Sequence, residues 1–269
     1  MSSTRKKFGL ALGSGGVRGL VHIGVIKTLV KYNLPIDFIA GTSVGAWVGA
    51  CYSTYRDLEK LTAMTSGYKK EKLLSFLQPT LQGGFVKGKK VASLLSELLG
   101  DNTFADLQIP LTVVATDLIS GQEVNISSGP VVPAVQASMA IPVVYKPIQY
   151  QDKLLVDGGL VNPVPDDIVR GMGADVVLAV NLDNYIAQYF ASDRLSISRT
   201  VSRSLNIGRH YLAQYSTRVA DIVIEPSIPL IGFSGWKKFF MDQTDQDIIR
   251  IGERETEAII PELRRLLAN

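Results

Sequence analysis

The sequence predicts an α/β fold with a mainly parallel central sheet, and two features near the N-terminus carry this prediction. The apolar run Phe8–Leu12 is typical of a buried strand and ends in a cluster of glycines. Beyond it, apolar residues keep a helical spacing through Lys31, and Pro35 ends that segment before a second apolar run, Ile36–Ala40. A strand, a helix and a strand in this order form a βαβ unit, which implies parallel strands and a right-handed crossover.

The rest of the chain continues this alternation of strands and helices. Residues 46–55 are apolar enough for a buried helix, polar helical segments follow as far as Gly100, and another covers about 192–218. One face of a C-terminal helix carries Ile259, Leu263, Leu266 and Leu267. Further strands are predicted at Leu111–Thr116, Glu123–Ile126, Val143–Ile148, Leu154–Val156, Val176–Asn181 and Ile222–Glu225. No repeat or low-complexity linker divides the chain, so residues 1–269 are predicted to form one domain.

The composition limits the classes of function. A chain of 269 residues, of which 46% are hydrophobic, can bury a substantial core, and its net charge of +3 does not indicate a nucleic-acid-binding surface. The single cysteine, Cys51, excludes an internal disulfide, and two histidines leave too few ligands for a structural zinc site. We therefore expect no metal, no cofactor and no nucleic-acid partner.

The N-terminus is basic, as in a signal peptide, but the glycines from Gly13 to Gly19 interrupt its apolar region. This pattern predicts a cytosolic protein. Two uncharged runs, Phe38–Tyr55 and Val124–Tyr145, have the length of a membrane span; however, the first is rich in Gly, Ser and Thr, and the second carries three prolines. Neither run is expected to insert into a membrane.

A candidate nucleophile lies directly after the second predicted strand. Residues Gly41–Gly45 fit the pattern G-x-S-x-G, with Ser43 at its centre. Gly41 and Gly45 leave room for a sharp turn from strand to helix, which holds the serine in a strained backbone conformation. The helix that follows points its positive end at the serine oxygen. Ser43 is therefore predicted to be a catalytic nucleophile.

The glycine cluster after the first strand is a candidate oxyanion site. Residues 13–19 read GSGGVRG, and glycines allow the backbone N–H groups of a strand-to-helix turn to face a bound anion. The alternative is a dinucleotide-binding loop, but Arg18 stands where the third glycine of that fingerprint is required. Asp37, the nearest acid downstream, also falls at the start of the second strand and not at its end.

Two proposals compete for the base that activates the serine. Ser43, Asp157 and His210 follow the chain order of an α/β-hydrolase triad, although His210 lies in a polar stretch typical of a solvated helix. Asp157 ends an apolar strand, and Gly158 and Gly159 follow it in a tight turn, which places a carboxylate where α/β sites gather. His22, on the first helix, is interpreted as a packed histidine that bridges its neighbours.

Three separated stretches resemble one family, the patatin-like phospholipases, and in particular its compact bacterial members. GLALGSGGVRGLVHIGVI is similar to the oxyanion motif of the family, GTSVG to its nucleophile motif and DGG to its aspartate motif, in the family's order. ATDLISGQE and ASMAIPVVYKPI also look like blocks that members carry between the serine and the aspartate. The similarity spans residues 8–183, and residues 184–269 are expected to complete the same domain.

The resemblance implies a three-layer α/β/α fold and a Ser–Asp dyad without a catalytic histidine. Carried over by motif, Ser43 is the nucleophile and Asp157 the base. The oxyanion site and the turn after the aspartate comprise Gly15, Gly16, Val17, Arg18, Gly158 and Gly159. One departure is Ser14, where many members have glycine. Since a serine keeps its own N–H, this departure bears only on the conformation of the turn.

The expected function is hydrolysis of lipid acyl esters, of the phospholipase A or lysophospholipase type. Acyl transfer or thioester hydrolysis by the same dyad, or lipid binding without turnover, are the alternatives. A phospholipid or lysophospholipid substrate also suggests peripheral contact at the inner face of a membrane. Two segments with lysines beside apolar or aromatic residues, 69–90 and 230–240, are candidates for that contact.

Overall fold

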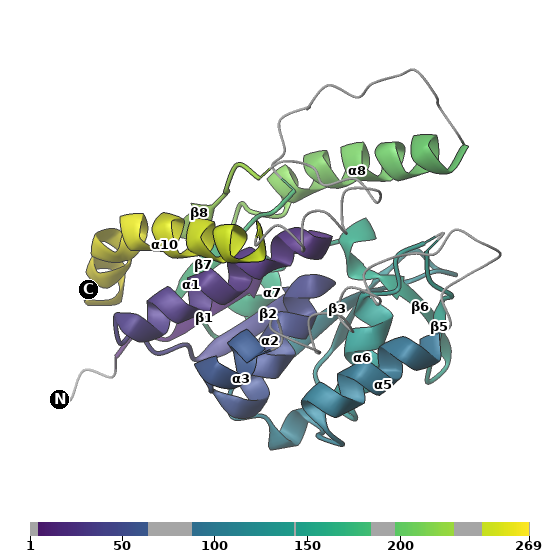
Figure 1. The fold of residues 1–269 in the computed structure, drawn as a ribbon, viewed down its shortest axis with the longest axis horizontal. Coiled ribbons are helices and arrows are strands. Elements are labelled where there is room, and N and C mark those ends of the chain that lie inside the picture. The colour runs from purple at the N-terminus through teal and green to yellow at the C-terminus, as the bar shows by residue number, and fades with distance from the viewer. Residues whose placement is uncertain (1–4, 64–87, 143, 184–196, 229–243, 269) are drawn as a thin grey trace.

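The computed structural model describes residues 5–63, 88–142, 144–183, 197–228 and 244–268. A mixed sheet of eight strands runs through the molecule in the order β5-β6-β3-β2-β1-β7-β8, and β4 pairs with β3 (Figure 1). The strands are β1 Phe8–Leu12, β2 Phe38–Thr42, β3 Leu111–Asp117, β4 Glu123–Ile126, β5 Ile148–Tyr150, β6 Lys153–Asp157, β7 Val176–Val180 and β8 Ile222–Ile224. The helices include α1 Leu20–Lys31, α2 Val44–Tyr55, α3 Leu58–Ala63, α5 Gly88–Leu99, α6 Val131–Ser138, α7 Asp166–Gly171, α8 Ile197–Tyr215 and α10 Thr244–Ala268.

The pairing confirms the predicted fold class. The strand β1 pairs with β2 and β7, β2 with β3 and β7 with β8, all in parallel. The N-terminal βαβ unit, β1-α1-β2, is therefore present. Antiparallel pairing joins β3 to β4 and β6, and β5 to β6, at one side of the sheet. The sheet is mostly parallel in its centre and antiparallel at the β5 edge.

Helices cover both faces of the sheet because alternate side chains of each strand point to opposite faces. Leu10 and Leu12 of β1 belong to the larger core, which also contains buried residues of α1, α2, α5, α6 and α10. Ala11 belongs to a smaller cluster on the other face, with Val169 of α7 and Ala213 of α8. The result is three layers, with small residues on the side where α7 packs close to the sheet.

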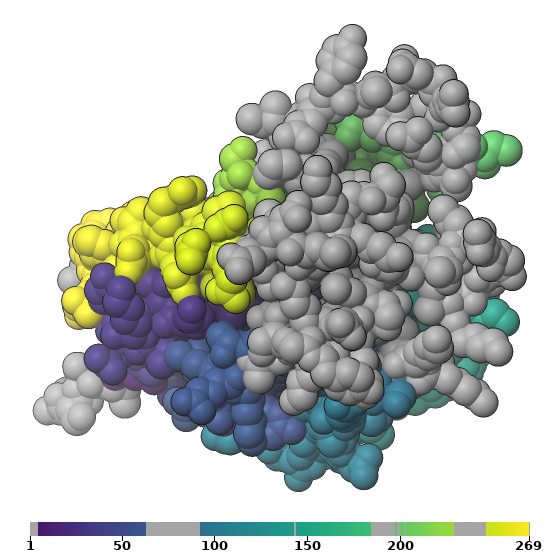
Figure 2. All heavy atoms as spheres, in the orientation of Figure 1, coloured from purple at the N-terminus to yellow at the C-terminus, as the bar shows by residue number. Residues whose placement is uncertain are grey.

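The C-terminal helix α10 lies along α1, and the two occupy neighbouring positions on the molecular surface (Figures 1 and 2). Their backbones approach closely at two glycines. A Cβ atom on Gly24 would overlap the carbonyl oxygen of Ile249, and one on Gly252 would overlap the carbonyl oxygen of Val21. The strand β8 and the helix α10 thus attach residues beyond 197 to the same sheet and core as the N-terminal part.

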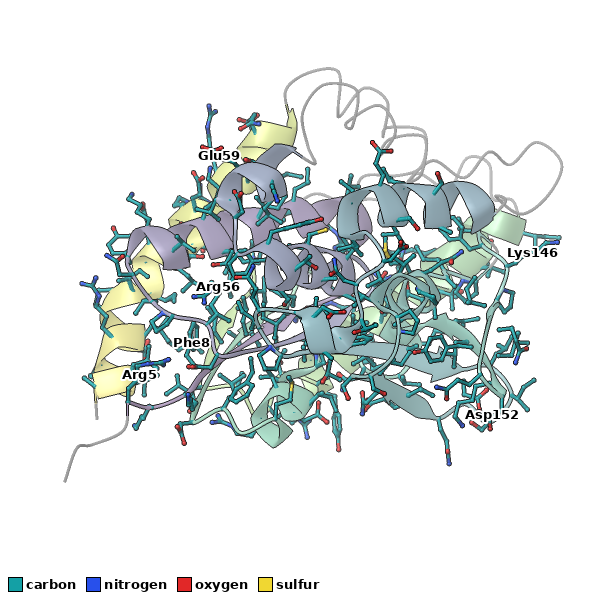
Figure 3. All side chains as sticks on the ribbon, turned by 90° about the horizontal axis from the view of Figure 1, so that it is seen from below. Arg5, Phe8, Arg56, Glu59, Lys146 and Asp152 are labelled. Atoms are coloured by element: carbon teal, nitrogen blue, oxygen red, sulfur yellow. The ribbon has the colours of Figure 1, made fainter. Side chains whose placement is uncertain are left out.

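Asp37 organises the amino end of the first two strands. Its carboxylate accepts hydrogen bonds from the amide of Phe8 and, in a bidentate pair, from the guanidinium of Arg5. Figure 3 shows Arg5 and Phe8 at one end of the molecule and Lys146 and Asp152 at the other. Because Asp37 precedes β2, it lies at the opposite edge of the sheet from the glycine cluster. This position does not suit the ribose contact of a dinucleotide site.

The predicted strand Val143–Ile148 is wrong. The strand β5 begins only at Ile148, because the carbonyl of Ile141 accepts hydrogen bonds from the amides of Val144 and Tyr145 and forms a turn there. Pro142 and Pro147 have no N–H to donate to a ladder. The strand β2 also begins two residues later than predicted, and neither α6 nor α7 was predicted from the pattern of apolar residues.

Candidate active site

The register of the sheet brings Ser43 and Asp157 to the two sides of β3. Thr42, the last residue of β2, is aligned with Val114. Asp157, the last residue of β6, is aligned with Ala115, the next residue of β3. Because β6 runs antiparallel to β3, its carboxyl end meets the carboxyl end of β2 from the opposite direction. Two residues separated by 114 positions in the chain thereby become neighbours.

Ser43 occupies a strained position between β2 and α2. Its backbone angles are φ 55° and ψ −122°, in the left-handed half of conformational space that residues with a side chain rarely adopt. The amide of Ser43 donates to the hydroxyl of Ser138 at 2.8 Å, and that hydroxyl donates to the carbonyl of Val114 at 2.6 Å. Ser138 therefore ties the strained turn to β3.

The glycines that flank Ser43 are required by packing. A Cβ atom on Gly45 would overlap the carbonyl of Leu12, at the end of β1. One on Gly41 would lie 2.6 Å from the backbone of Ala46. The start of α2 therefore packs directly against the strand that leads into the glycine cluster.

Asp157 forms a direct hydrogen bond with the serine. Ser43 Oγ donates to Asp157 Oδ2 at 2.6 Å, and the amide of Gly159 donates to Oδ1 at 2.7 Å. Burial raises the pKa of the Asp157 carboxyl, while the bond from Ser43, the charge of Arg209 and the bond from Gly159 act in the opposite direction. A carboxylate whose pKa lies above its usual range is better suited to accept a proton from a hydroxyl.

The turn after Asp157 is held against β3. Gly158 and Gly159 begin the short 3₁₀ helix η3, Gly158–Leu160. A Cβ atom on Gly158 would overlap the carbonyl of Val114, so no larger residue fits this approach. The hydroxyl of Thr116 also donates to the backbone carbonyl of Asp157 at 2.9 Å. These contacts fix the carboxylate from both its backbone and its side chain.

The glycine cluster lies beside the serine. The amide of Gly13 donates to Val180 and that of Ser14 to Pro163, so the start of the loop is fixed to β7 and to the chain beyond η3. Gly15 then leads into the 3₁₀ helix η1, Gly16–Gly19. Gly19 packs against Val44, the first residue of α2, so closely that a Cβ atom would overlap it.

The amides of Gly15 and Gly16 stand out within this loop. Among the described residues, no hydrogen bond from the amide of Gly15 or Gly16 to another residue is present. Val17 and Arg18 are buried, and the guanidinium of Arg18 donates to the carbonyl of Gly15 at 3.2 Å. The side chain of Arg18 thus braces the backbone that carries these amides.

Neither histidine lies between the serine and the aspartate. His22 is buried, and its Nε2 donates to the carbonyl of Gly13 at 2.8 Å; burial lowers its pKa to about 4. It bridges neighbours, as the sequence analysis expects. His210 lies on α8, where its Nδ1 bonds to the carbonyl of Asp183 at 2.8 Å. In a triad the histidine would separate Ser43 from Asp157, whereas here the two side chains bond directly. The geometry favours the dyad over the triad.

The sequence of this chain is similar to a known family of proteins. The profile described as "Patatin-like phospholipase" matches residues 10–169, which is more than half of the chain and includes the glycine cluster, Ser43 and Asp157. The chain belongs to the patatin-like phospholipase family. An uncharacterized NTE family protein of Mycobacterium tuberculosis is 37% identical over 182 residues, which cover 67% of this chain and 50% of that protein.

Other relatives carry names that refer to phospholipid chemistry. "Lysophospholipase nte1" of Aspergillus fumigatus is 32% identical over 65% of this chain and 12% of its own length. "Patatin-like phospholipase domain-containing protein 6" of Homo sapiens is 31% identical over 66% of this chain and 14% of its own length. The patatin-like chain described here therefore matches half or less of each of these relatives.

A solved structure shares the patatin-like fold. VipD from Legionella pneumophila superposes with a TM-score of 0.59 at 12% identity, and the match covers 96% of this chain and 67% of VipD. At this identity the likeness supports the fold alone, and it confirms the predicted patatin-like architecture with helices on both sides of a mainly parallel sheet.

Two polar residues near the site were not predicted from the sequence. Ser138 lies within ASMAIP, a block that resembles the family, but its bond to the amide of Ser43 depends on the helix α6, which was not predicted. Asp183 follows the predicted strand Val176–Asn181, and its position at a strand end was the available signal. The departure at Ser14 also finds its explanation here, since Ser14 Oγ donates to Asp183 Oδ2 at 2.7 Å.

Proposed function

We propose that the protein is a serine hydrolase of lipid acyl esters, of the phospholipase A or lysophospholipase type. Membership of the patatin-like phospholipase family supports a lipid hydrolase. The observation that carries the proposal is the 2.6 Å hydrogen bond from Ser43 Oγ to Asp157 Oδ2, on a serine with a left-handed backbone. A hydroxyl bonded to a buried carboxylate, beside free amides, is the arrangement that nucleophilic acyl chemistry requires.

In the first half of the reaction, Ser43 Oγ attacks the ester carbonyl carbon while Asp157 accepts its proton. The carbonyl oxygen gains negative charge, which the N–H groups of Gly15 and Gly16 stabilise. When the tetrahedral intermediate collapses, the bond to the leaving alcohol breaks and Asp157 returns the proton to that oxygen. The fatty acyl group is then bound to Ser43 as an ester.

In the second half, water takes the place of the alcohol. The water oxygen attacks the carbonyl carbon of the acyl-serine while Asp157 accepts a proton from the water, and the same amides bind the oxyanion. As this intermediate collapses, the bond between the acyl carbon and Ser43 Oγ breaks, Asp157 returns the proton to Oγ, and the fatty acid is released. The chemistry uses one carboxylate in both halves, so no histidine is needed. An alcohol acceptor or a thioester substrate would follow the same steps, and product analysis distinguishes these variants.

Labelling and product analysis test this function. A fluorophosphonate should label Ser43 in the wild-type protein and fail to label Ser43→Ala. Incubation with phospholipids, lysophospholipids and acylglycerols should yield free fatty acid in water, and the same substitution should abolish it. Wild-type protein that neither reacts with the fluorophosphonate nor releases fatty acid would support lipid binding without turnover.

We also propose that the protein contacts the lipid surface that holds its substrate. Within the described residues, the structure contains no helix with the length and apolar character of a membrane span. Of the two candidate segments from the sequence, residues 69–87 and 230–240 lie outside the described residues. A third surface supports the proposal: Ile197, Val201, Ile207, Tyr211 and Tyr215 are all exposed on α8.

These residues form one stripe, since their spacing places them on a single side of a helix. Ile197 is 86% exposed, Tyr211 66% and Tyr215 63%. The helix α8 contains arginines and no Asp or Glu. An exposed apolar stripe on a basic helix is typical of a segment that lies in the interface of an anionic membrane.

A further inference from the structure

A second buried carboxylate lies behind the active site. Asp183 follows β7, and its side chain is fully buried. Its Oδ2 accepts hydrogen bonds from Ser14 Oγ at 2.7 Å and from Arg209 Nε at 3.0 Å. Its Oδ1 accepts from Arg18 Nη2 at 3.0 Å and from Arg209 Nη2 at 2.6 Å. The mechanism proposed above does not use this residue.

The donors to Asp183 come from separate parts of the chain. Ser14 belongs to the glycine loop, Arg18 to η1 and Arg209 to α8, which lies beyond the region that the family profile matches. Arg18 also donates to the carbonyl of Gly15, so its bond to Asp183 is linked to the backbone of the oxyanion loop. One carboxylate therefore joins α8 to the segment that carries the free amides.

The same cluster reaches the proposed base. The amide of Gly159 bonds to Asp157, and a Cβ atom on Gly159 would lie 3.2 Å from both Arg209 Cδ and Ser14 Oγ. The charged groups whose field acts on Asp157 are Arg209 on α8, which favours the ionised form, and Asp183 after β7, which opposes it. Arg18 of η1 in turn faces Asp183.

Buried ion pairs often contribute little net stability, because desolvation of the charges offsets their attraction. Stability alone therefore does not explain two arginines around this carboxylate. The number of charges does explain them. Two arginines, Arg18 and Arg209, balance the two negative charges of Asp157 and Asp183 in a space from which water is largely excluded. The pKa of Asp183 is lowered, since the charges of Arg209 and Arg18 outweigh its burial.

We propose that Asp183 is a positioning residue that, through Ser14, Arg18 and Arg209, holds the oxyanion loop against the Ser43–Asp157 pair, and that the positive charge of Arg209 stabilises the Asp157 carboxylate. This inference rests on the proposed function. It assigns to α8 a part in the active site, in addition to the surface stripe described above.

The charge of Arg209 is tested by the pH dependence of kcat/KM on a water-soluble short-chain ester, which avoids effects of lipid binding. Asp157 must be ionised to accept a proton, so activity falls as the pH drops through its folded pKa. Arg209→Gln removes the positive charge and should move this acid limb to higher pH. We therefore expect the ratio of the variant's kcat/KM to the wild-type value to be about tenfold lower at a pH on the acid limb than at a pH on the plateau.

Matched variants separate charge from structure. Arg209→Lys keeps the charge and should restore the wild-type position of the acid limb, although loss of the bidentate bond lowers the plateau. Arg203→Gln removes an arginine from the same helix and should leave the limb unchanged. A folded Arg209→Gln protein with a wild-type acid limb, or an Arg209→Lys protein whose limb moves as far as that of Arg209→Gln, would overturn the inference.

The anchoring role is tested separately, by the rate at which fluorophosphonate labels Ser43. Ser14→Ala removes one bond to Asp183 without changing a charge, and Asp183→Asn weakens the others. Both should lower the labelling rate, the second by at least about tenfold, and Ser14→Ala should not move the acid limb. A wild-type labelling rate in either variant contradicts the anchoring. If the wild-type protein itself is not labelled, it is the proposed function that fails.

Discussion

At the scale of single residues, the environment of Ser43 and Asp157 supports the proposal that this pair acts without a histidine. The strained backbone of Ser43 turns its hydroxyl toward Asp157, and the hydrogen bond that its amide donates to the Ser138 hydroxyl holds that conformation. Burial raises the pKa of Asp157, so its carboxylate attracts a proton more strongly than an exposed aspartate does. Hydrogen bonds from Ser43 and Gly159 satisfy both of its oxygens and keep it from being an unpaired buried charge.

The assignment of Asp157 as the base predicts unequal effects of two substitutions. Asp157→Asn keeps the shape of the side chain but cannot accept the proton, so we expect kcat to fall by roughly 10²–10⁴-fold or more. His210→Ala removes only the ring that bonds to the carbonyl of Asp183, and kcat should stay within about tenfold of wild type. Steady-state kinetics on a soluble ester measures both.

Circular dichroism and thermal melting provide the control that each variant is folded. Substantial turnover by Asp157→Asn, or loss of turnover in a folded His210→Ala protein, would contradict the dyad and support a triad that includes His210.

At the scale of elements, two helices place polar side chains beside the candidate site. The helix α6 places Ser138 under the amide of the nucleophile. The helix α8 buries Ala213 against α7 and the sheet and brings Arg209 to Asp183. On its outer side, the exposed stripe remains, and the guanidinium of Arg218 lies 4.0 Å from the ring centre of Tyr215. The helix α8 thus connects the buried Asp183 cluster with the surface that we propose contacts lipid.

The stripe on α8 predicts weaker membrane association when its aromatic residues are changed. The double substitution Tyr211→Ser and Tyr215→Ser removes apolar area that would enter the interface, so partition onto anionic vesicles should fall by roughly tenfold. Co-sedimentation with vesicles that contain phosphatidylserine measures this partition. Hydrolysis of a soluble ester should be unchanged.

Ile119→Ser is a matched control, because Ile119 is 79% exposed but lies in the turn between β3 and β4. An equal loss of vesicle binding in this control would show that any exposed apolar residue suffices. Unaltered binding by the double variant would remove α8 as the contact surface.

At the scale of the whole molecule, the C-terminal part completes the fold. The strand β8 extends the sheet beside β7, and α10 covers α1 with backbone contact at Gly24 and Gly252. Ile248, Ile249, Ile260 and Leu263 of α10 belong to the main core. We propose on these grounds that the full chain forms one domain, since removal of α10 would expose the apolar face of α1.

The close contact of α1 and α10 predicts a stability defect without a catalytic one. Gly252→Ala places a methyl group onto the carbonyl of Val21, so the helices must separate, at a cost of about 1–3 kcal/mol. Gly171→Ala is the control, since nothing lies within 4 Å of its Cβ position. Urea titration measures the free energy of unfolding, and fluorophosphonate labelling should remain intact below the transition. Equal stability of the two variants would contradict close packing at this seam.

The sequence by itself determined what depends on neighbouring residues. The glycine-bounded turns at 13–19 and 41–45, the βαβ unit and the identity of Ser43 and Asp157 as candidates all follow from local pattern, because strand periodicity and turn chemistry act over a few positions. The misplaced strand at Val143–Ile148 marks the limit of such patterns, since a turn after Ile141 overrides a β-branched run.

Only the tertiary structure decided which of these residues meet. Ser43 and Asp157 bond because β6 runs antiparallel to β3 and is aligned so that Asp157 faces Ala115, and a shift by one residue would turn its carboxylate to the other face of the sheet. The contact of Arg209 with Asp183 likewise depends on how α8 packs on the sheet. Strand register and helix packing arise from contacts between distant parts of the chain, and no local pattern encodes them.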